Sequence, residues 1–214
     1  KYLKLLRVEQ WVKNFFVFIP LFFSGNIMHP NFFVKSVFAF IVCSLIASSI
    51  YILNDYKDIE ADQKHPEKKD RPLANGSISK TTALFLFTTL ISAVAMLVFF
   101  GQEYFHKNLW KFAVIIGSYF IMNLAYTFRL KHVAIVDIFI IAIGFVLRVL
   151  AGGYATGIKI SQWAILLTFV LALVLAVGKR RGELINAAIS GKTRKALDGY
   201  NVQFADIVLS ISVT

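Results

Sequence analysis

Residues 32–62 read FFVKSVFAFIVCSLIASSIYIL and then, without a break, NDYKDIEAD. Residues 32–53 are almost entirely apolar and have the length that a membrane-spanning helix needs, about 20 residues. The run that follows brings four acids to the end of this helix: Asp55, Asp58, Glu60 and Asp62. An apolar run that leads directly into acids predicts a membrane helix with a carboxylate cluster at one end.

The spacing of these acids indicates a shared face. Asp55, Asp58 and Asp62 are three and four residues apart, which on a helix places their side chains together, and Asn54 extends the pattern by one turn. The run holds no His or Cys, and hard oxygen ligands suit Mg²⁺, which keeps several waters and bridges to substrate phosphates. We therefore predict a Mg²⁺ site on Asp55, Asp58 and Asp62. The alternative is a solvated, negatively charged helix end, although acids beside a membrane core are costly unless they are used.

The rest of the chain resembles this first apolar run. Hydrophobic residues make up 57% of the sequence, and the mean hydropathy is +0.67. We predict an all-α, polytopic transmembrane helical bundle with six spans, at Trp11–Phe23, Phe32–Leu53, Thr82–Phe100, Trp110–Phe128, Val133–Ala151 and Trp163–Val177. A seventh span starts near Phe204 and is still apolar at Thr214, so we expect further helices beyond that residue. Pro20 predicts a kink or a tilt in the first span.

The distribution of cations predicts the orientation. Of the 23 Lys and Arg residues, 18 lie in segments 1–13, 54–80, 129–131 and 178–199. The opposite loops and span ends hold four: Lys35, Lys107, Lys111 and Lys159. This asymmetry follows the positive-inside rule and places the N-terminus and the acids on the cytoplasmic side of a bacterial or archaeal plasma membrane.

The same asymmetry bears on partners and domains. The net charge is +11, and the cations are concentrated on one side of the membrane. This distribution indicates a role in membrane orientation and in binding anionic lipid and phosphate ligands, and not a nucleic-acid partner. No Gly-, Ser- or Pro-rich linker interrupts residues 1–214, so we expect one transmembrane catalytic domain. The sequence is also compatible with assembly of this domain into a homo-oligomer. Its two long polar segments, 54–80 and 178–199, are predicted loops on the cytoplasmic face.

Several motifs resemble the UbiA superfamily of intramembrane prenyltransferases. Asn54-Asp55-x-x-Asp58-x-x-x-Asp62, followed by Arg71-Pro72-Leu73 and Gly76, is similar to the signature of that superfamily. Tyr126 and Lys131 resemble its second conserved region. Within the superfamily, Arg7-x-x-Gln10-Trp11-x-Lys13-Asn14 and Gly178-Lys179-Arg180-Arg181-x-Glu183 look most like decaprenyl-phosphate phosphoribosyltransferases.

This resemblance implies a function. Enzymes of that branch move 5-phosphoribose from phosphoribosyl pyrophosphate to a polyprenyl phosphate, with Mg²⁺, for cell wall biosynthesis. The nearer alternative is a prenyltransferase that joins a prenyl diphosphate to an aromatic or other small acceptor with the same acidic motif. The distant alternative is a membrane transporter, but transporters place polar groups near the bilayer midplane, often within repeats, whereas the polar groups here gather at one face.

The later motif separates the two enzyme alternatives. Typical aromatic prenyltransferases of the superfamily carry a second acid-rich motif after the sixth span, whereas this chain has GKRRGEL at 178–184. We interpret Lys179, Arg180 and Arg181 as ligands for an additional substrate phosphate, because Arg forks and Lys point charges bind phosphate. Glu183, the acid of the same motif, is a further predicted substrate-binding residue. The alternative is an ordinary positive-inside anchor.

Four further residues are candidate substrate ligands, and Arg148 is a fifth charged or polar residue whose role is open. Lys13 and Asn14 either bind phosphate or anchor the first span at the interface with Trp11. Arg71 either closes on the diphosphate or pairs with a loop acid, Asp70 or Glu67. Asp137 lies about one turn inside the fifth span, near the depth of the active site. Arg148 is about 16 Å further along that helix, at 1.5 Å per residue, where it either acts in function, holds helices together or snorkels outward.

Overall fold

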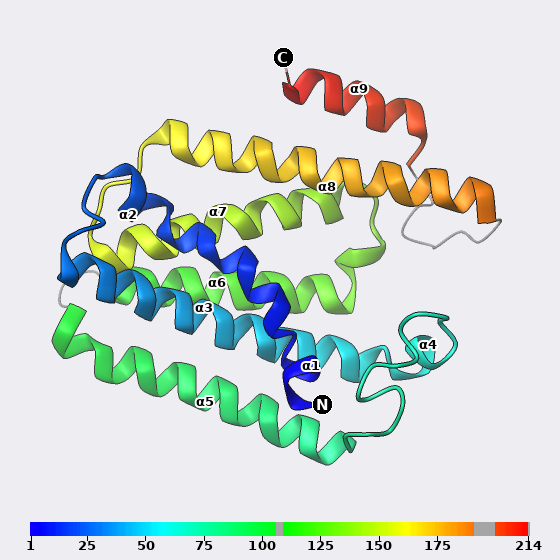
Figure 1. Ribbon diagram of the computed structural model, residues 1–214, viewed down its shortest axis with the longest axis horizontal. Helices are drawn as coiled ribbons and strands as arrows, with labels where there is room; N and C mark the ends of the chain where they lie inside the picture. The colour runs from blue at the N-terminus through cyan, green and yellow to red at the C-terminus, as the bar shows by residue number, and fades with distance from the viewer. Residues whose placement is uncertain (106–108, 191–199, 214) are drawn as a thin grey trace. The chain divides into compact units, whose positions relative to one another are not determined.

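The computed structural model describes residues 1–105, 109–190 and 200–213, in which every regular element is helical (Figure 1). In chain order they are α1 (Tyr2–Leu6), the 3₁₀ helix η1 (Val8–Phe18), α2 (Ile19–Phe23), α3 (Pro30–Lys57), α4 (Ile59–Gln63), α5 (Lys80–Phe105), α6 (Leu109–Phe128), the 3₁₀ turn η3 (Leu130–His132), α7 (Val136–Thr156), α8 (Gln162–Ser190) and α9 (Val202–Val213). Lys107 and the stretch 191–199 of the second predicted loop lie outside these residues.

The chain divides into two compact units. Unit 1 comprises Lys1–Phe120 and Arg148–Lys159, and unit 2 comprises Ile121–Leu147 and Ile160–Thr214. Both units are built from helices, so the all-helical fold class is confirmed. The prediction of a single catalytic domain over 1–214 stays a prediction.

Among the described residues, five helices are long and apolar enough to cross a membrane: Pro30–Lys57, Lys80–Gly101, Leu109–Phe128, Val136–Thr156 and Gln162–Asn186. They correspond to five of the six predicted spans, most of them longer by several residues. The predicted seventh span corresponds to the shorter apolar helix Val202–Ile211.

The first predicted span, Trp11–Phe23, is not among these five helices. The segment is instead the 11-residue η1 followed by the five-residue α2, and the change to α-helix falls at Ile19, directly before Pro20. Proline fits the first turn of a helix because it lacks an N–H and fixes φ, so the predicted irregularity lies at the expected residue. A 3₁₀ helix rises about 2.0 Å per residue, so η1 and α2 together reach at most about 30 Å, which is close to the thickness of a bilayer core.

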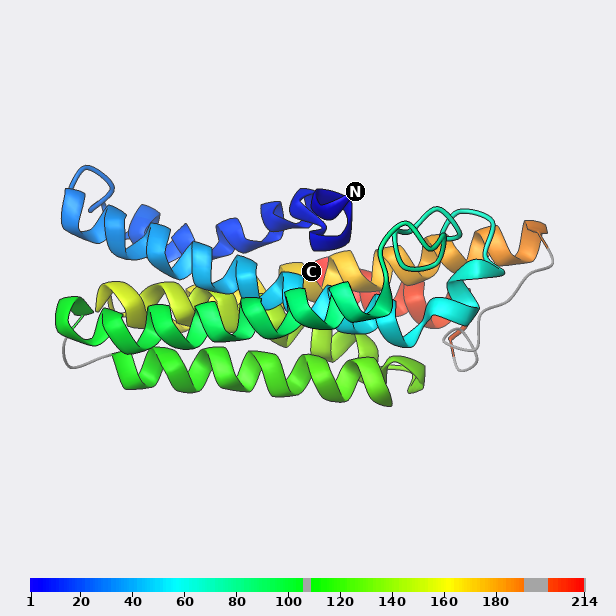
Figure 2. The ribbon, with the colours of Figure 1, turned by 90° about the horizontal axis from the view of Figure 1, so that it is seen from below.

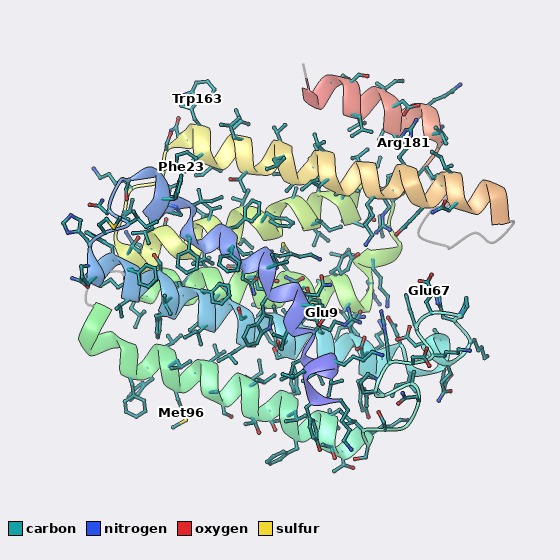
Figure 3. The ribbon with its side chains drawn as sticks, viewed as in Figure 1. Glu9, Phe23, Glu67, Met96, Trp163 and Arg181 are labelled. Carbon is teal, nitrogen blue, oxygen red and sulfur yellow. The ribbon has the colours of Figure 1, made fainter. Side chains whose placement is uncertain are left out.

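In unit 1, α5 runs alongside α3 in both ribbon views (Figures 1 and 2). The outward side of α5 is apolar and exposed, as expected of a helix that faces lipid: Met96 is 58% exposed and projects away from the helix (Figure 3). At the other end of α5, the segment between α4 and α5 is not a purely polar loop. Its buried Leu73 and Ile78 pack with Leu5 of α1 and Ile52 of α3 in one apolar cluster.

A glycine contact fixes η1 against the end of α7 within unit 1. A Cβ atom added to Gly152 would collide with the backbone carbonyl of Val17. Only glycine permits this approach of two backbones, which is the packing role expected of small residues in membrane helices.

Unit 2 consists of the end of α6, η3, most of α7, α8 and α9. Its apolar core contains Ile138 of α7, Val177 of α8 and Ala205 of α9. Tyr200, which precedes α9, also belongs to this core. The prediction that 178–199 is a loop is wrong for its first 13 residues, because α8 continues from the membrane span to Ser190. Residues 178–190 contain helix formers and no proline, and Arg180 pairs with Glu183 at the helical i, i+3 spacing.

Candidate active site

The acidic cluster of unit 1 forms where α3 gives way to α4. The α-helix stops at Asp58 (φ −95°, ψ 11°), but the backbone keeps its helical bonds, from Asp58 N to Asn54 O and from Asp62 N to Asp58 O. The near-helical path places Asp55 and Asp62 within reach of one guanidinium group. This part of the predicted acidic face is therefore present in the structure.

Asp55 and Asp62 are buried carboxylates that two arginines neutralise. Asp55 is 2% exposed and Asp62 is 3% exposed. Asp55 Oδ1 accepts hydrogen bonds from Arg7 NH2 at 2.5 Å and from Arg71 NH1 at 3.1 Å. Arg71 NH1 also donates to Asp62 Oδ2 at 2.6 Å. Because a buried charge is costly unless it is paired, these contacts explain how two acids are tolerated at the end of a membrane helix.

Arg71 therefore lies in the acidic cluster and not beside a loop acid. The structure pairs its side chain with Asp55 and Asp62, whereas Asp70 and Glu67 are exposed on the loop (Figure 3). The loop that carries Arg71 is held by several bonds, among them Gln63 Nε2 to Ala74 O at 3.1 Å and Ile78 N to Pro72 O at 3.0 Å. Gly76, with φ 73°, supplies the left-handed turn of this loop.

Arg7 is a site residue that the sequence reasoning did not single out. It joins α1 to η1 in the left-handed conformation, with φ and ψ both 50°. Its guanidinium lies 5.0 Å from the ring centroid of Tyr51, one helical turn before Asp55. The signal that could have identified it is its place as the first residue of the Arg7-x-x-Gln10-Trp11 motif.

The remaining members of the motif are less enclosed. Asp58 and Asn54 are half-buried, and Glu60 is exposed. In the described parts of the chain, no three His, Cys, Asp or Glu side chains converge as a ready-made metal cage. Mg²⁺ requires no such cage, since it is commonly held by one or two carboxylates together with waters and substrate phosphates. The carboxylates of Asp55 and Asp62, which both accept hydrogen bonds from Arg71, fit that donor set.

Two side-chain hydrogen bonds join η1 to the part of α3 that precedes Asp55. Beyond Arg7 and Asp55, Trp11 Nε1 donates to Ser48 Oγ at 3.0 Å, and Asn14 Nδ2 donates to Ser44 Oγ at 3.0 Å. Lys13, the neighbour of Asn14, is exposed. Asn14 is 1% exposed and its amide serves protein partners, so the structure supports a packing role for it, and its predicted phosphate contact stays a prediction.

Arg148 holds helices together in unit 1. Its Nε donates to Asn14 Oδ1 and its NH2 donates to the Tyr119 hydroxyl, both at 2.7 Å, and it lies over the Tyr119 ring. With 7% exposure it does not snorkel outward. Of the roles considered for this residue, the structure favours the link between η1, α6 and α7.

Unit 2 holds a second charged cluster, around Asp137. Asp137 is 1% exposed, and its Oδ2 accepts from Arg180 Nε at 2.8 Å. Arg180 NH1 also donates to Glu183 at 2.6 Å, and the Tyr126 hydroxyl accepts a further hydrogen bond from Arg180. The structure thus brings together four predicted site residues that come from α6, α7 and α8.

Tyr200 completes the cluster of unit 2. Its hydroxyl donates to Asp137 Oδ1 and accepts from the backbone N of Ile135 at 2.6 Å. Burial raises the pKa of this hydroxyl above its ordinary value, and the bond to Asp137 raises that pKa further. Tyr200 therefore stays a neutral donor and ties the segment before α9 to the start of α7. Nothing in the sequence pattern had indicated it.

The other basic candidates in this region are on the surface. Lys179 is exposed, and Arg181 pairs with Asp206 of α9 at 2.5 Å, with side-chain exposures of 40% and 49% (Figure 3). Lys131 is half-buried in η3. The three consecutive cations therefore differ: Arg180 is enclosed between carboxylates, whereas Lys179 and Arg181 face outward.

The model of the UbiA prenyltransferase family matches residues 15–178. The chain belongs to this family. Family membership agrees with the five apolar helices of spanning length, and together they indicate an integral membrane protein. It also argues against the transporter alternative.

Characterised relatives match nearly the whole chain. A decaprenyl-phosphate phosphoribosyltransferase of Mycolicibacterium smegmatis is 39% identical over 99% of this chain and 66% of its own length. One of Corynebacterium glutamicum is 35% identical, over 99% of this chain and 63% of its own length. The chain thus spans somewhat less than two thirds of the length of these relatives. The solved structure of a UbiA homologue from Archaeoglobus fulgidus, bound to DMAPP and Mg²⁺, shares the fold, with a TM-score of 0.73 and 19% identity over all of this chain and 73% of that one.

Proposed function

We propose that this chain belongs to an integral-membrane transferase that moves 5-phosphoribose from phosphoribosyl pyrophosphate to a polyprenyl phosphate, decaprenyl phosphate being the acceptor that the relatives' names suggest. The observation that carries the proposal is the 35–39% identity to decaprenyl-phosphate phosphoribosyltransferases over 99% of the chain. The basic 178–184 segment supports it, because the donor carries a 5-phosphate in addition to its diphosphate.

The acidic cluster is the proposed donor site. Asp55 and Asp58 would hold Mg²⁺, with Asp62 as a direct or water-mediated ligand and Asn54 beside them. When bound, Mg²⁺ supplies charge stabilisation for a departing diphosphate. The A. fulgidus homologue, whose structure contains Mg²⁺ and a prenyl diphosphate, supports this cofactor. The buried carboxylates, the half-buried Asp58 and the adjacent guanidinium of Arg71 provide the donor set and a cation for diphosphate oxygens.

The basic residues of α8 receive different roles in the proposal. Arg180 is already bound to Asp137 and Glu183, so we assign it to positioning those two side chains and Tyr126. Lys179 is exposed, and Arg181 is held by a surface ion pair, which is worth little and is readily exchanged. Within unit 2 these two side chains are the better phosphate ligands, together with Lys131. Within unit 1 the exposed Lys13 is a further candidate.

The chemistry requires no side-chain base. The attacking group is an oxygen of the lipid phosphate, which is already an anion, and the leaving group is a diphosphate. Residues of this chain would therefore act by binding and orienting both phosphates and by stabilising the charge that the diphosphate gains as the anomeric C–O bond breaks. This requirement matches a chain whose clusters consist of carboxylates, guanidinium groups and phenols.

The orientation follows the cation asymmetry: we place the acidic cluster at the cytoplasmic side, where phosphoribosyl pyrophosphate is available, with the polyprenyl tail in the bilayer. The second candidate function is a prenyltransferase that uses a prenyl diphosphate as its donor, because the fold is shared with a homologue solved with DMAPP.

One comparison of substrates tests the proposal. The full chain, purified in detergent with Mg²⁺, is given labelled phosphoribosyl pyrophosphate with decaprenyl phosphate, or a prenyl diphosphate with 4-hydroxybenzoate. We expect label in the lipid fraction only with the first pair, and chelation with EDTA should abolish it. Consumption of the prenyl diphosphate, with phosphoribosyl pyrophosphate untouched, would replace the proposal by the aromatic prenyltransferase alternative.

A further inference from the structure

The contacts of Arg7 and η1 with α3 run in opposite order along the two segments. Positions 7, 11 and 14 on one segment meet positions 55, 48 and 44 on the other, through an ion pair and two hydrogen bonds. Seven residues of 3₁₀ helix rise about 14 Å, whereas the same residues would rise about 10.5 Å as an α-helix. The 11 residues of α3 between the outermost partners rise about 16.5 Å. The unusual 3₁₀ conformation therefore lets the short segment match α3 and brings Arg7 to Asp55.

The acids and arginines of this cluster balance each other without any other ion. Asp55 and Asp62 carry two negative charges, and Arg7 and Arg71 carry two positive charges, with all four linked through Asp55 Oδ1 and Arg71 NH1. A divalent cation on these carboxylates would add two positive charges to an already neutral group. Such a cation can enter only if the arginines redirect their charge to incoming anions.

We propose that Arg7 is the resident counter-ion of Asp55, and that it transfers to a phosphate of the donor when a divalent cation takes the carboxylate. This rests on the proposed function in that the anion is the diphosphate of the donor. Arg7 then both competes with the metal and helps to bind the anion that accompanies it.

The surroundings of Arg7 suit such an exchange. The Asp55 contact uses one of the five N–H donors of the guanidinium, and the side chain is 20% exposed, so an anion can reach it. Its backbone is fixed on both sides, by the fully buried Leu5 before it and by the Trp11–Ser48 bond after it. The planar group also rests on the Tyr51 ring. The side chain can therefore change partners while the backbone stays in place.

Arg71 differs from Arg7 in this respect. It bridges two carboxylates, Asp55 and Asp62, and is carried by a hydrogen-bonded loop. Arg7 pairs with Asp55 and makes the shorter contact to its Oδ1. Loss of Arg7 therefore leaves the two acids linked by Arg71 but removes one positive charge, which is the change that isolates its competition with a metal ion.

The test uses Mn²⁺ as the metal probe and inorganic pyrophosphate as the anion probe, with the full chain in detergent. Free Mn²⁺ is measured by electron paramagnetic resonance, and pyrophosphate binding is measured by calorimetry at saturating Mn²⁺. In Arg7→Gln we expect Mn²⁺ alone to bind roughly tenfold more tightly, and pyrophosphate to bind roughly ten- to hundredfold more weakly, the range that one charged hydrogen bond supports. Arg7→Lys, which keeps the charge but loses the fork, should fall between.

The matched control is Lys4→Gln, which removes a cation from the same N-terminal arm, one that donates to the backbone carbonyl of Asp70 at the surface. It should change neither affinity by more than about twofold, in line with the small effect of a surface contact. If Arg7 has only a structural role, Arg7→Gln should bind both Mn²⁺ and pyrophosphate more weakly. That result, or unchanged affinities for both, overturns the inference. If the Arg7 variants show the predicted changes in affinity but the wild-type protein transfers no phosphoribose, the proposed function alone is contradicted. Wild-type transfer with no Arg7 effect would contradict the inference alone.

Discussion

Arg180 and Arg181 are adjacent in the sequence, and substituting each in turn should have very different consequences for stability. Arg180→Met keeps the aliphatic stem and its packing but removes the charge from between Asp137 and Glu183. Asp137, 1% exposed, would keep the neutral Tyr200 hydroxyl but lose its cation. Breaking one side of a buried ion pair costs about 3–5 kcal/mol, because the remaining charge is buried and uncompensated.

The matched control is Arg181→Met, whose partner Asp206 is 49% exposed at the side chain. A surface pair of this kind contributes about 0–1 kcal/mol. For a chain of this size, about 1 kcal/mol corresponds to a shift in Tm of about 2–4 °C. Arg180→Met should therefore lower the Tm by roughly 6–20 °C, and Arg181→Met by no more than about 4 °C.

The assay is thermal unfolding in detergent, followed by the monodisperse fraction that remains after heating. Asp137→Asn and the double variant Arg180→Met/Asp137→Asn extend it to a cycle, in which the double variant should be more stable than the sum of the single changes predicts, because the uncompensated charge is gone. Equal, small Tm shifts for Arg180→Met and Arg181→Met, or additive effects in the cycle, would refute the argument that Arg180 stabilises the fold as the buried counter-ion of Asp137.

Arg181→Ala should instead weaken phosphoribosyl pyrophosphate binding, by about tenfold if Arg181 exchanges its exposed partner Asp206 for a phosphate.

Three further predictions test the acids, the packing and the orientation. Asp58→Asn should lower Mg²⁺-dependent turnover about a hundredfold or more with little change in Tm, since a half-buried ligand charge is lost; near-normal activity would return the acids to the role of a solvated helix end. Gly152→Ala should lower stability by about 1–3 kcal/mol, because its Cβ would meet the Val17 carbonyl, whereas Gly117→Ala, with open space around its Cβ, should be neutral or slightly stabilising; equal Tm values would contradict the close approach. A single cysteine at the exposed Ser77, in a Cys43→Ser background, should react with an impermeant maleimide only from the cytoplasmic side, and one at the exposed Lys159 only from the other side; the reverse labelling would invert the proposed orientation.

The long helices could be predicted from the sequence because their signal is local. An apolar run of about 20 residues identifies a span without any knowledge of its neighbours. The same locality explains the error at Trp11–Phe23, where apolar content does not distinguish an α-helix from the 3₁₀ helix η1. It also explains why the predicted end of α8 came too early: hydropathy falls at Gly178, but residues 179–181, 183 and 184 are good helix formers and continue the helix past two glycines.

The acidic face could be predicted, but its counter-charges could not. Asp55 and Asp62 are neighbours by helical spacing, whereas Arg7 reaches Asp55 across 48 positions and Arg180 reaches Asp137 across 43. Arg148 reaches Asn14 across 134 positions. Pairings of this kind depend on how helices pack, and one sequence without relatives carries no record of them. For Arg148 the sequence nevertheless restricted the roles to a few, because an intramembrane cation requires a partner.

The cations counted for topology differ in burial. Lys4, Lys57, Lys64 and Lys179 are exposed, as a charge that only marks the cytoplasmic side would be. Arg7, Arg71 and Arg180, by contrast, have side-chain exposures of 20%, 23% and 9%, and each is bound to a buried carboxylate. A guanidinium is more weakly hydrated than an ammonium and offers a planar fork, so it can be buried against a carboxylate at lower cost. The positive-inside count therefore combines two populations: exposed cations that mark the cytoplasmic side, and the three arginines that neutralise buried acids within each unit. Exchanging Arg for Lys at positions 7, 71 or 180 would preserve the first function and weaken the second, because an ammonium keeps the charge but is more strongly hydrated and lacks the fork.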